Sequence, residues 1–256
     1  MRRALLLDLD ETLVPDEPAA VAAFEATAAV AAASHDVDVG SLAVSARSSA
    51  RELWYATPAL EYAQRIGMSS WEGLWCRFEG DEPNTRWLRK WSPEYRRETW
   101  RLALAGQGID DPELAEQLGE RFPTERRARL EAFDDVPAAL AALSESHELA
   151  IVTNGLSCLQ REKLVAAGLD GRFAAVVVSA EFGVGKPDAG IFAYALEELG
   201  VDGGVMVGDS LARDVDGARA AGLDAVWMNR YGQPHPADRP DLAEVSTLAE
   251  LPHFIF

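Results

Sequence analysis

Two aspartates, Asp8 and Asp10, follow a short apolar run near the start of the chain. Residues two apart in a strand point to the same side, so the two carboxylates would repel each other if the strand continued. We therefore expect both acids just past the strand's carboxyl end, where open α/β sheets bind ligands and a cation can stabilise the charge. A surface turn whose acids cap a helix is the simpler alternative.

Two later segments, IVTNG and GVGKPD, place further polar residues directly after apolar runs. Thr153 and Asn154 offer a hydroxyl, an amide and free backbone N–H groups before a helix, which together make an anion-binding cradle. N-capping of that helix is the alternative for this loop taken alone. Lys186 precedes Pro187 in a chain that has only three lysines, so its compact positive charge favours a functional role.

The segment VMVGDSLARDVDG adds two more acids, Asp209 at the end of an apolar run and Asp214 five residues later. Together with Asp8 they form an oxygen-rich set suited to Mg²⁺, which prefers a few carboxylates, retained waters and a substrate phosphate. The alternative for Asp214 is simple electrostatic stabilisation of a helix N-terminus.

Each of these polar residues follows a short apolar run, and the run would position it. The length and composition of the runs predict buried parallel strands. The runs are Ala4–Leu7, Leu149–Val152, Ala174–Val178, Val205–Val207 and Ala225–Met228. Helical patterns lie between them and end at glycines, namely Leu159–Ala167, Gly190–Leu199 and Asp214–Ala221. Strand alternating with helix predicts an α/β fold, a Rossmann-like doubly wound parallel sheet.

The region between the first strand and the rest of the sheet has a different pattern, rich in Ala, Arg, Glu and Leu and without a convincing strand. We expect residues 16–131 to form an inserted all-helical cap, and residues 1–15 with 132–256 to form the core. The candidate cap helices are Ala19–Ala33, Gly40–Tyr55, Leu60–Ile66, Pro93–Ala105 and Pro112–Phe122.

Composition excludes several classes of function. The 24 basic and 42 acidic residues give a net charge of −18, which would repel a nucleic-acid backbone. We found no apolar stretch near the roughly 20 residues that cross a membrane, and we expect a soluble, cytoplasmic protein. Cys76 and Cys158 stand far apart, so no disulfide framework or thiolate zinc site is indicated. A monomer and a homodimer are equally compatible with the sequence.

The polar segments together resemble the four motifs of the haloacid dehalogenase-like (HAD) hydrolase superfamily. The matching elements are DxDxT (Asp8, Asp10, Thr12), a strand ending in Thr153, the Lys186–Pro187 pair, and GDSxxxxD (Asp209, Asp214). The helical insertion resembles the cap of the superfamily's type-one capped members. Within them, TNG…QREKL and GKPDAGIF are most similar to the branch that contains N-acylneuraminate-9-phosphatase and pyrimidine 5'-nucleotidases.

The resemblance implies a Mg²⁺-dependent phosphatase acting on a small phosphomonoester, such as a sugar phosphate or a nucleoside monophosphate. Asp8 would form an aspartyl-phosphate, and Asp10 would protonate the leaving group and later deprotonate the attacking water. The remaining implied roles are phosphate binding by Thr153, Asn154 and Lys186, metal binding by Asp8, Asp209, Asp214 and the Asp10 carbonyl, and support from Thr12, Gly155 and Ser210. A cap of this type would close over the site, exclude water and contact the substrate.

Substrate contacts in the cap are harder to identify. Arg47, Arg51, Trp54 and Tyr55 are the candidates, although aromatic residues at helical spacing are usually core and charges on a helix usually form a solvated face. The superfamily that the chain resembles also includes proteins with functions other than phosphatase activity. Haloacid dehalogenases attack carbon and lack the second aspartate, so Asp10 favours phosphate-ester hydrolysis, while phosphomutases share it. A non-catalytic binding module is the third alternative.

Overall fold

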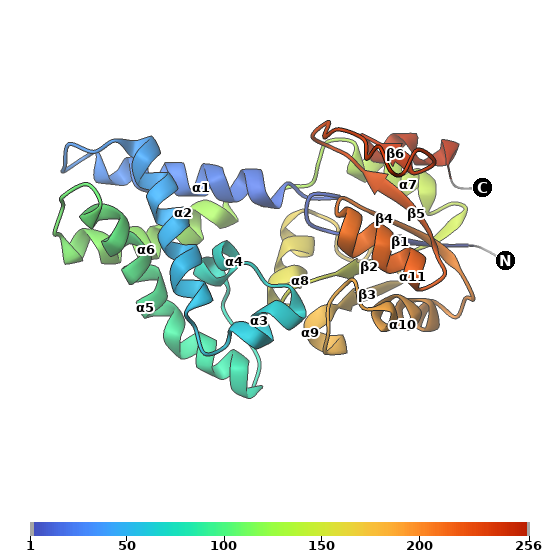
Figure 1. Ribbon diagram of the computed structural model, residues 1–256, viewed down its shortest axis with the longest axis horizontal. Helices are drawn as coiled ribbons and strands as arrows, with labels where there is room; N and C mark the ends of the chain where they lie inside the picture. The colour runs from blue at the N-terminus through green and yellow to red at the C-terminus, as the bar shows by residue number, and fades with distance from the viewer. Residues whose placement is uncertain (1–2, 255–256) are drawn as a thin grey trace. The chain divides into compact units, whose positions relative to one another are not determined.

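The computed structural model describes residues 3–254, and its internal contacts divide the chain into two compact units (Figure 1). The core unit comprises Met1–Pro15 with Glu131–Phe256, and the helical unit comprises Asp16–Leu130. The core unit contains a six-stranded sheet of order β3-β2-β1-β4-β5-β6, in which every neighbouring pair is parallel. Its strands are β1 Arg3–Leu7, β2 His147–Thr153, β3 Ala175–Val178, β4 Gly204–Gly208, β5 Asp224–Met228 and β6 Ala243–Val245.

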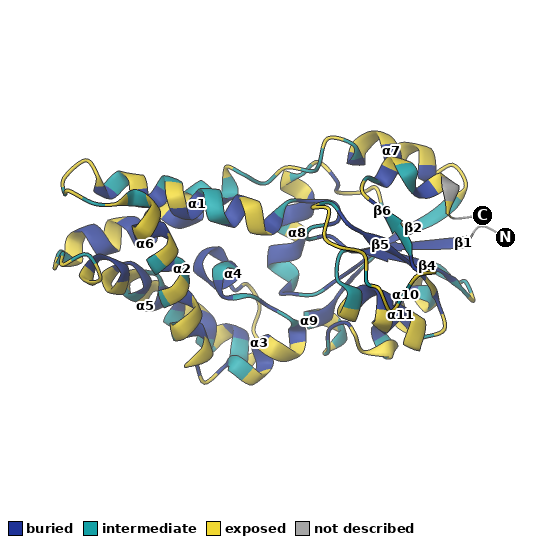
Figure 2. Cartoon of the chain, turned by 45° about the horizontal axis from the view of Figure 1, so that its top comes forward, coloured by how far each residue is buried: buried dark blue, intermediate teal, exposed yellow. Residues whose placement is uncertain are grey.

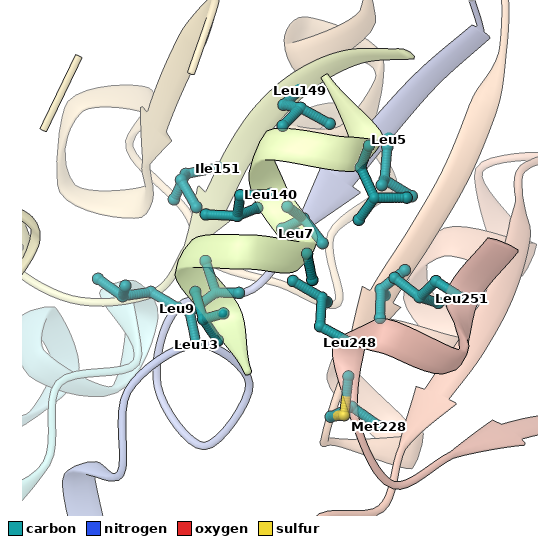
Figure 3. Close-up of a cluster of buried hydrophobic side chains, with 14 of the residues drawn as sticks. Leu5, Leu7, Leu9, Leu13, Leu140, Leu149, Ile151, Met228, Leu248 and Leu251 are labelled. Atoms are coloured by element: carbon teal, nitrogen blue, oxygen red, sulfur yellow. The ribbon is translucent and has the colours of Figure 1, made fainter. Parts of the chain in front are cut away.

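Helices cover both faces of this sheet, because successive strand residues point to opposite sides. Leu5 and Leu7 of β1 pack in one apolar cluster with Leu140 (Figure 3), whereas Leu6 packs in a second cluster with Phe192. The helical elements are α7 Val136–Leu143, α8 Ser157–Ala166, α9 Ser179–Phe182, α10 Ala189–Leu199, the π-helical turn η1 Leu211–Asp216, α11 Gly217–Ala220 and the 3₁₀ segment η2 Leu248–His253. The predicted doubly wound parallel sheet is confirmed.

The strand order reverses at β1. The chain runs from β1 through β2 to β3 on one side and then returns to place β4, β5 and β6 on the other. Leu7 at the end of β1 lies opposite Val207 of β4, so the carboxyl ends of these two strands are adjacent. Crevices that bind ligands in open α/β sheets lie at such a reversal.

The described residues of the helical unit form helices joined by loops, with no strand among them. No described helix of the chain is long and apolar enough to cross a membrane. Its helices are α1 Asp16–Ala31, α2 Val39–Tyr55, α3 Leu60–Ile66, α4 Ser70–Trp75, α5 Pro83–Ala105 and α6 Pro112–Arg127. They bury one side each (Figure 2), with Phe24 of α1 contacting the rings of Trp100 and Phe122. Asp16 and Arg126 form a buried ion pair of 2.5 Å within this unit.

Three helices of this unit differ most from the prediction, and one of them, α6, continues to Arg127, five residues beyond the predicted end at Phe122. Helix α5 begins at Pro83, ten residues before the predicted start at Pro93. A proline inside a helix cannot donate to the carbonyl four residues earlier, which here belongs to Arg89. The Ser92 hydroxyl donates to that carbonyl instead, at 3.2 Å. The short helix α4 was not predicted; its capping box between Ser69 and Glu72 explains how six residues form a helix.

Candidate active site

The first motif lies in a tight turn at the end of β1. The Asp8 N–H donates to the Val207 carbonyl at 2.9 Å, so its backbone still pairs with β4. Three residues later Glu11 has a positive φ of 59°, and its N–H donates to the Val14 carbonyl at 2.8 Å. The chain therefore turns back at once, and Asp8 and Asp10 do not share one face of a continuing strand.

Asp8, Asp209 and Asp214 converge beyond the ends of β1 and β4. Each offers a carboxylate oxygen, and these three oxygens lie within 4.8 Å of one another. Gly208 permits the approach of Asp214, because a Cβ at Gly208 would stand 2.3 Å from the Asp214 Cγ. The Ser210 N–H donates to Asp214 Oδ2 at 2.9 Å and fixes that side chain. The close approach at Gly208 and this hydrogen bond thus place Asp214 of the fourth motif beside Asp8 of the first.

Lys186 is buried between two of these acids. Its Nζ lies 2.7 Å from Asp8 Oδ1 and 2.6 Å from Asp214 Oδ1. Burial alone would lower the pKa of this ammonium, but the two carboxylates outweigh burial and the pKa is raised, so the group stays charged. Asn154 holds the Lys186 backbone from both sides: its Oδ1 accepts from the Lys186 N–H at 2.8 Å, and its Nδ2 donates to the Lys186 carbonyl at 3.0 Å.

The acid cluster carries more negative charge than Lys186 can neutralise. Burial, with the neighbouring Asp8 and Asp214, raises the pKa of Asp209 to about 8. Burial also raises the pKa of Asp214 to about 6, against the opposing effect of Lys186. Buried carboxylates need compensating charge, and a set of hard oxygen donors fits Mg²⁺. The donor chemistry of these residues therefore fits the metal that the sequence predicts.

Asp10 contacts a different set of residues. Its Oδ1 lies 2.8 Å from Lys163 Nζ, and its Oδ2 accepts from Gln160 Nε2 at 3.0 Å. Both partners come from α8 and were missed by the sequence prediction. Lysine is rare in this chain, which has only three, and Lys163 also lies in the segment QREKL that resembles the family.

The remaining motif residues occupy the loops around these acids. Thr153, the last residue of β2, is 1% exposed, and its Oγ1 accepts from Gln160 Nε2 at 3.0 Å. Gly155 has a φ of +133° and its N–H donates to Ser179 Oγ at 2.9 Å. Thr12 is buried, and its carbonyl accepts from Arg230, 2.8 Å from Nη2.

The four cap candidates all lie in the helical unit, in α2. Arg47 forms an ion pair with Glu17, and Arg51 lies over the Tyr55 ring at 5.6 Å from its centroid. Trp54 is 2% exposed and belongs to the core of this unit, whereas Tyr55 is exposed. Trp54 is therefore a packing residue, whereas solvent can reach the side chains of Arg47, Arg51 and Tyr55.

Comparison with known proteins adds family evidence to this geometry. The family model of haloacid dehalogenase-like hydrolases matches residues 2–222. A phosphoserine phosphatase of Thermus thermophilus is 39% identical over 244 residues, which cover 94% of each chain. The N-acylneuraminate-9-phosphatase of Mus musculus is 37% identical over 149 residues, covering 57% of this chain and 60% of that protein.

Solved structures share this fold over nearly the whole chain. The HAD-hydrolase YfnB of Bacillus subtilis, determined with magnesium, has a TM-score of 0.65 at 22% identity and covers 98% of this chain and 97% of its own. A 2-haloacid dehalogenase of Pseudomonas syringae has a TM-score of 0.59 at 28% identity, covering 99% and 97%. A HAD phosphatase of Thermococcus onnurineus has a TM-score of 0.54 at 27% identity, covering 98% and 96%, so the fold is shared by proteins named for two different reactions.

Proposed function

The chain belongs to the haloacid dehalogenase-like hydrolase family and is a phosphoric monoester hydrolase, and from that premise we propose a Mg²⁺-dependent reaction through an aspartyl-phosphate on Asp8. The observation that carries this proposal is the arrangement around Lys186. One buried ammonium and three converging carboxylates lie at the reversal point of the sheet. Such a site would hold a cation and a phosphoryl group side by side, which is what phosphoryl transfer requires.

In the first step an Asp8 carboxylate oxygen attacks phosphorus, and the bond between phosphorus and the leaving oxygen breaks. Lys186 and Thr153, with the Asn154 N–H, hold the phosphoryl oxygens and stabilise the charge that develops on them. Lys186 is well placed for this because the Asn154 side chain fixes its backbone at two atoms. The phosphoryl group then resides on Asp8 as an acyl phosphate.

Asp10 supplies and removes protons in this scheme. It protonates the departing alkoxide, and in the second step it takes a proton from the water that attacks the phosphoenzyme. Asp10 lies outside the group formed by Asp8, Asp209 and Asp214, and its carboxylate contacts α8 instead. This separation supports distinct roles for the two acids of the first motif.

Asp8, Asp209 and Asp214, with the Asp10 carbonyl, would hold Mg²⁺, which when bound supplies positive charge next to the transferred phosphoryl group. Burial, with Asp8 and Asp214 nearby, raises the pKa of Asp209 to about 8, so its negative charge lacks the compensation that a bound dication would supply.

For the substrate we propose a phosphorylated hydroxy amino acid of the O-phosphoserine type. The support is the relative named phosphoserine phosphatase, whose similarity extends over 94% of this chain and so includes the helical unit. The relatives named for N-acylneuraminate 9-phosphate and for pyrimidine nucleotides match 57% and 44% of this chain. Sugar phosphates and nucleoside monophosphates, expected from the sequence, remain the comparison substrates.

The test is phosphate release from O-phosphoserine, sugar phosphates and nucleoside monophosphates, with Mg²⁺ or with EDTA. We expect turnover with Mg²⁺ only, and a loss of at least about a thousandfold in Asp8→Asn, because the nucleophile is removed. Asp81→Asn, at an exposed acid, is the matched control. Activity within tenfold of wild type in Asp8→Asn would contradict the mechanism. Conversion of a sugar phosphate to its isomer would show that the protein is a phosphomutase instead. Halide release from a 2-haloacid, without phosphatase activity, would show that it is a dehalogenase.

A further inference from the structure

Two side chains of α8 hold the carboxylate of Asp10, and neither belongs to the motifs that define the site. Lys163 Nζ lies 2.8 Å from Oδ1, and Gln160 Nε2 donates to Oδ2 at 3.0 Å. The two residues are three positions apart on a helix and therefore lie on the same face. Each oxygen of Asp10 thus has its own partner from one rigid element.

The burial of these partners is unusual for their residue types. Both Lys163 and Gln160 are 0% exposed, while the Asp10 side chain is 24% exposed. Lysine is almost never fully buried unless it is paired, because an ammonium loses its hydration there. Burying an ammonium to pair it with a partly exposed carboxylate costs hydration free energy and adds little stability to the fold. We therefore infer that Lys163 has a role in the reaction of Asp10.

Gln160 also connects Asp10 to the phosphate-binding loop. Its Nε2 carries two hydrogens but lies within hydrogen-bonding distance of Asp10 Oδ2, Thr153 Oγ1 and the Asn154 carbonyl. Its Oε1 is buried and accepts no hydrogen bond from the described residues. Gly155 makes room for the amide, since a Cβ there would stand 2.8 Å from Nε2. One amide therefore ties together the acid–base group and the loop that holds phosphate.

We propose that Lys163 and Gln160 are positioning residues that set the carboxylate of Asp10 for proton transfer, a role that rests on the function proposed above. The step most dependent on them is breakdown of the phosphoenzyme. There a water oxygen attacks phosphorus, its proton passes to Asp10, and the bond from phosphorus to the Asp8 oxygen breaks to restore the Asp8 carboxylate. A displaced Asp10 slows this step.

The test uses p-nitrophenyl phosphate, whose leaving group departs without a proton, so formation of the phosphoenzyme does not depend on Asp10. In Lys163→Met we expect a burst of p-nitrophenolate at a rate within about threefold of wild type, then a steady state slowed by roughly 10- to 100-fold, part of the 10²–10⁴ that acid–base groups contribute. Gln160→Leu, which removes no charge, should slow the steady state by a similar factor, while the burst is compared in Lys163→Met alone because Gln160 also contacts Thr153 and Asn154. Lys90→Met, at an exposed lysine, should match wild type.

A double-variant cycle then separates positioning from general damage. If Lys163 acts through Asp10, adding Lys163→Met to Asp10→Asn changes the steady-state rate by less than about twofold, because the group that it positions is already lost. Burst and steady-state rates that fall by the same factor, or additive losses in the cycle, would overturn the inference while leaving the phosphatase intact. A wild-type protein that releases no p-nitrophenolate would instead refute the proposed function itself.

Discussion

Replacing Lys186 by methionine should destabilise the protein strongly in EDTA and much less in Mg²⁺. The ammonium lies 2.7 and 2.6 Å from two carboxylates, and its side chain is 2% exposed. Even at 4 Å and an effective dielectric constant near 20, each such pair attracts by about 4 kcal/mol. Burial of the ions offsets part of this, and removing one partner of a buried pair costs about 3–5 kcal/mol because the other charge is left uncompensated.

Thermal unfolding measures this effect. For a chain of this size, 1 kcal/mol shifts Tm by about 2–4 °C, so Lys186→Met in EDTA should unfold about 10 °C below wild type. Mg²⁺ should recover most of the loss, because the carboxylates regain a cation, while activity stays low because Lys186 also holds phosphate. Lys90→Met controls for loss of one lysine. A drop in EDTA no larger than that of Lys90→Met would refute the electrostatic argument.

Two further predictions concern the same site. Burial and two neighbouring carboxylates raise the pKa of Asp209 to about 8, so the folded state binds this proton more tightly than the unfolded state does. Metal-free protein should therefore lose stability as pH rises from about 4 to about 8. The loss should be smaller in Asp209→Asn, which has no carboxyl group to titrate at this position. A Tm in EDTA that rises between pH 6 and pH 8 would contradict this prediction. Gly155→Ala should cost more than the roughly 1 kcal/mol expected of alanine at positive φ, because its Cβ also collides with Gln160. Gly183→Ala, at a φ of +107° and with nothing within 4 Å of the added Cβ, is the control nearest in backbone conformation, and equal Tm losses in the two variants would show that the collision is harmless.

The strands could be predicted because a parallel sheet covered on both faces leaves no place for polar side chains along a strand. Each predicted apolar run is a strand in the structure, with ends that differ by one or two residues, as in β2, which extends from His147 to Thr153. The sixth strand, Ala243–Val245, was missed. It is three residues long, contains Glu244 and pairs only with β5, so it has neither the length nor the apolar run that the rule requires.

Helix boundaries in the helical unit are harder to predict, because a proline favours the first turn of a helix but does not always mark it. At Pro112 that rule holds and α6 begins there, with Asp111 capping it. At Pro93 it fails, because the Ser92 hydroxyl satisfies the Arg89 carbonyl that the proline leaves without its usual donor. The deciding contact is local, but its geometry is not visible in the residue pattern.

The partners of Asp10 show which part of a site escapes sequence reasoning and which signal could reveal it. Asp10 and Lys163 are 153 positions apart, and only the fold brings them together. The buried face of α8 consists of Leu159, Gln160, Lys163 and Leu164, so two polar residues interrupt a stripe that packing alone would make apolar. Because a buried polar side chain needs a partner, such an interruption on a helix that follows a phosphate-binding loop predicts a contact with the charged site. Read this way, the glutamine and lysine of QREKL are as informative as the aspartates they hold.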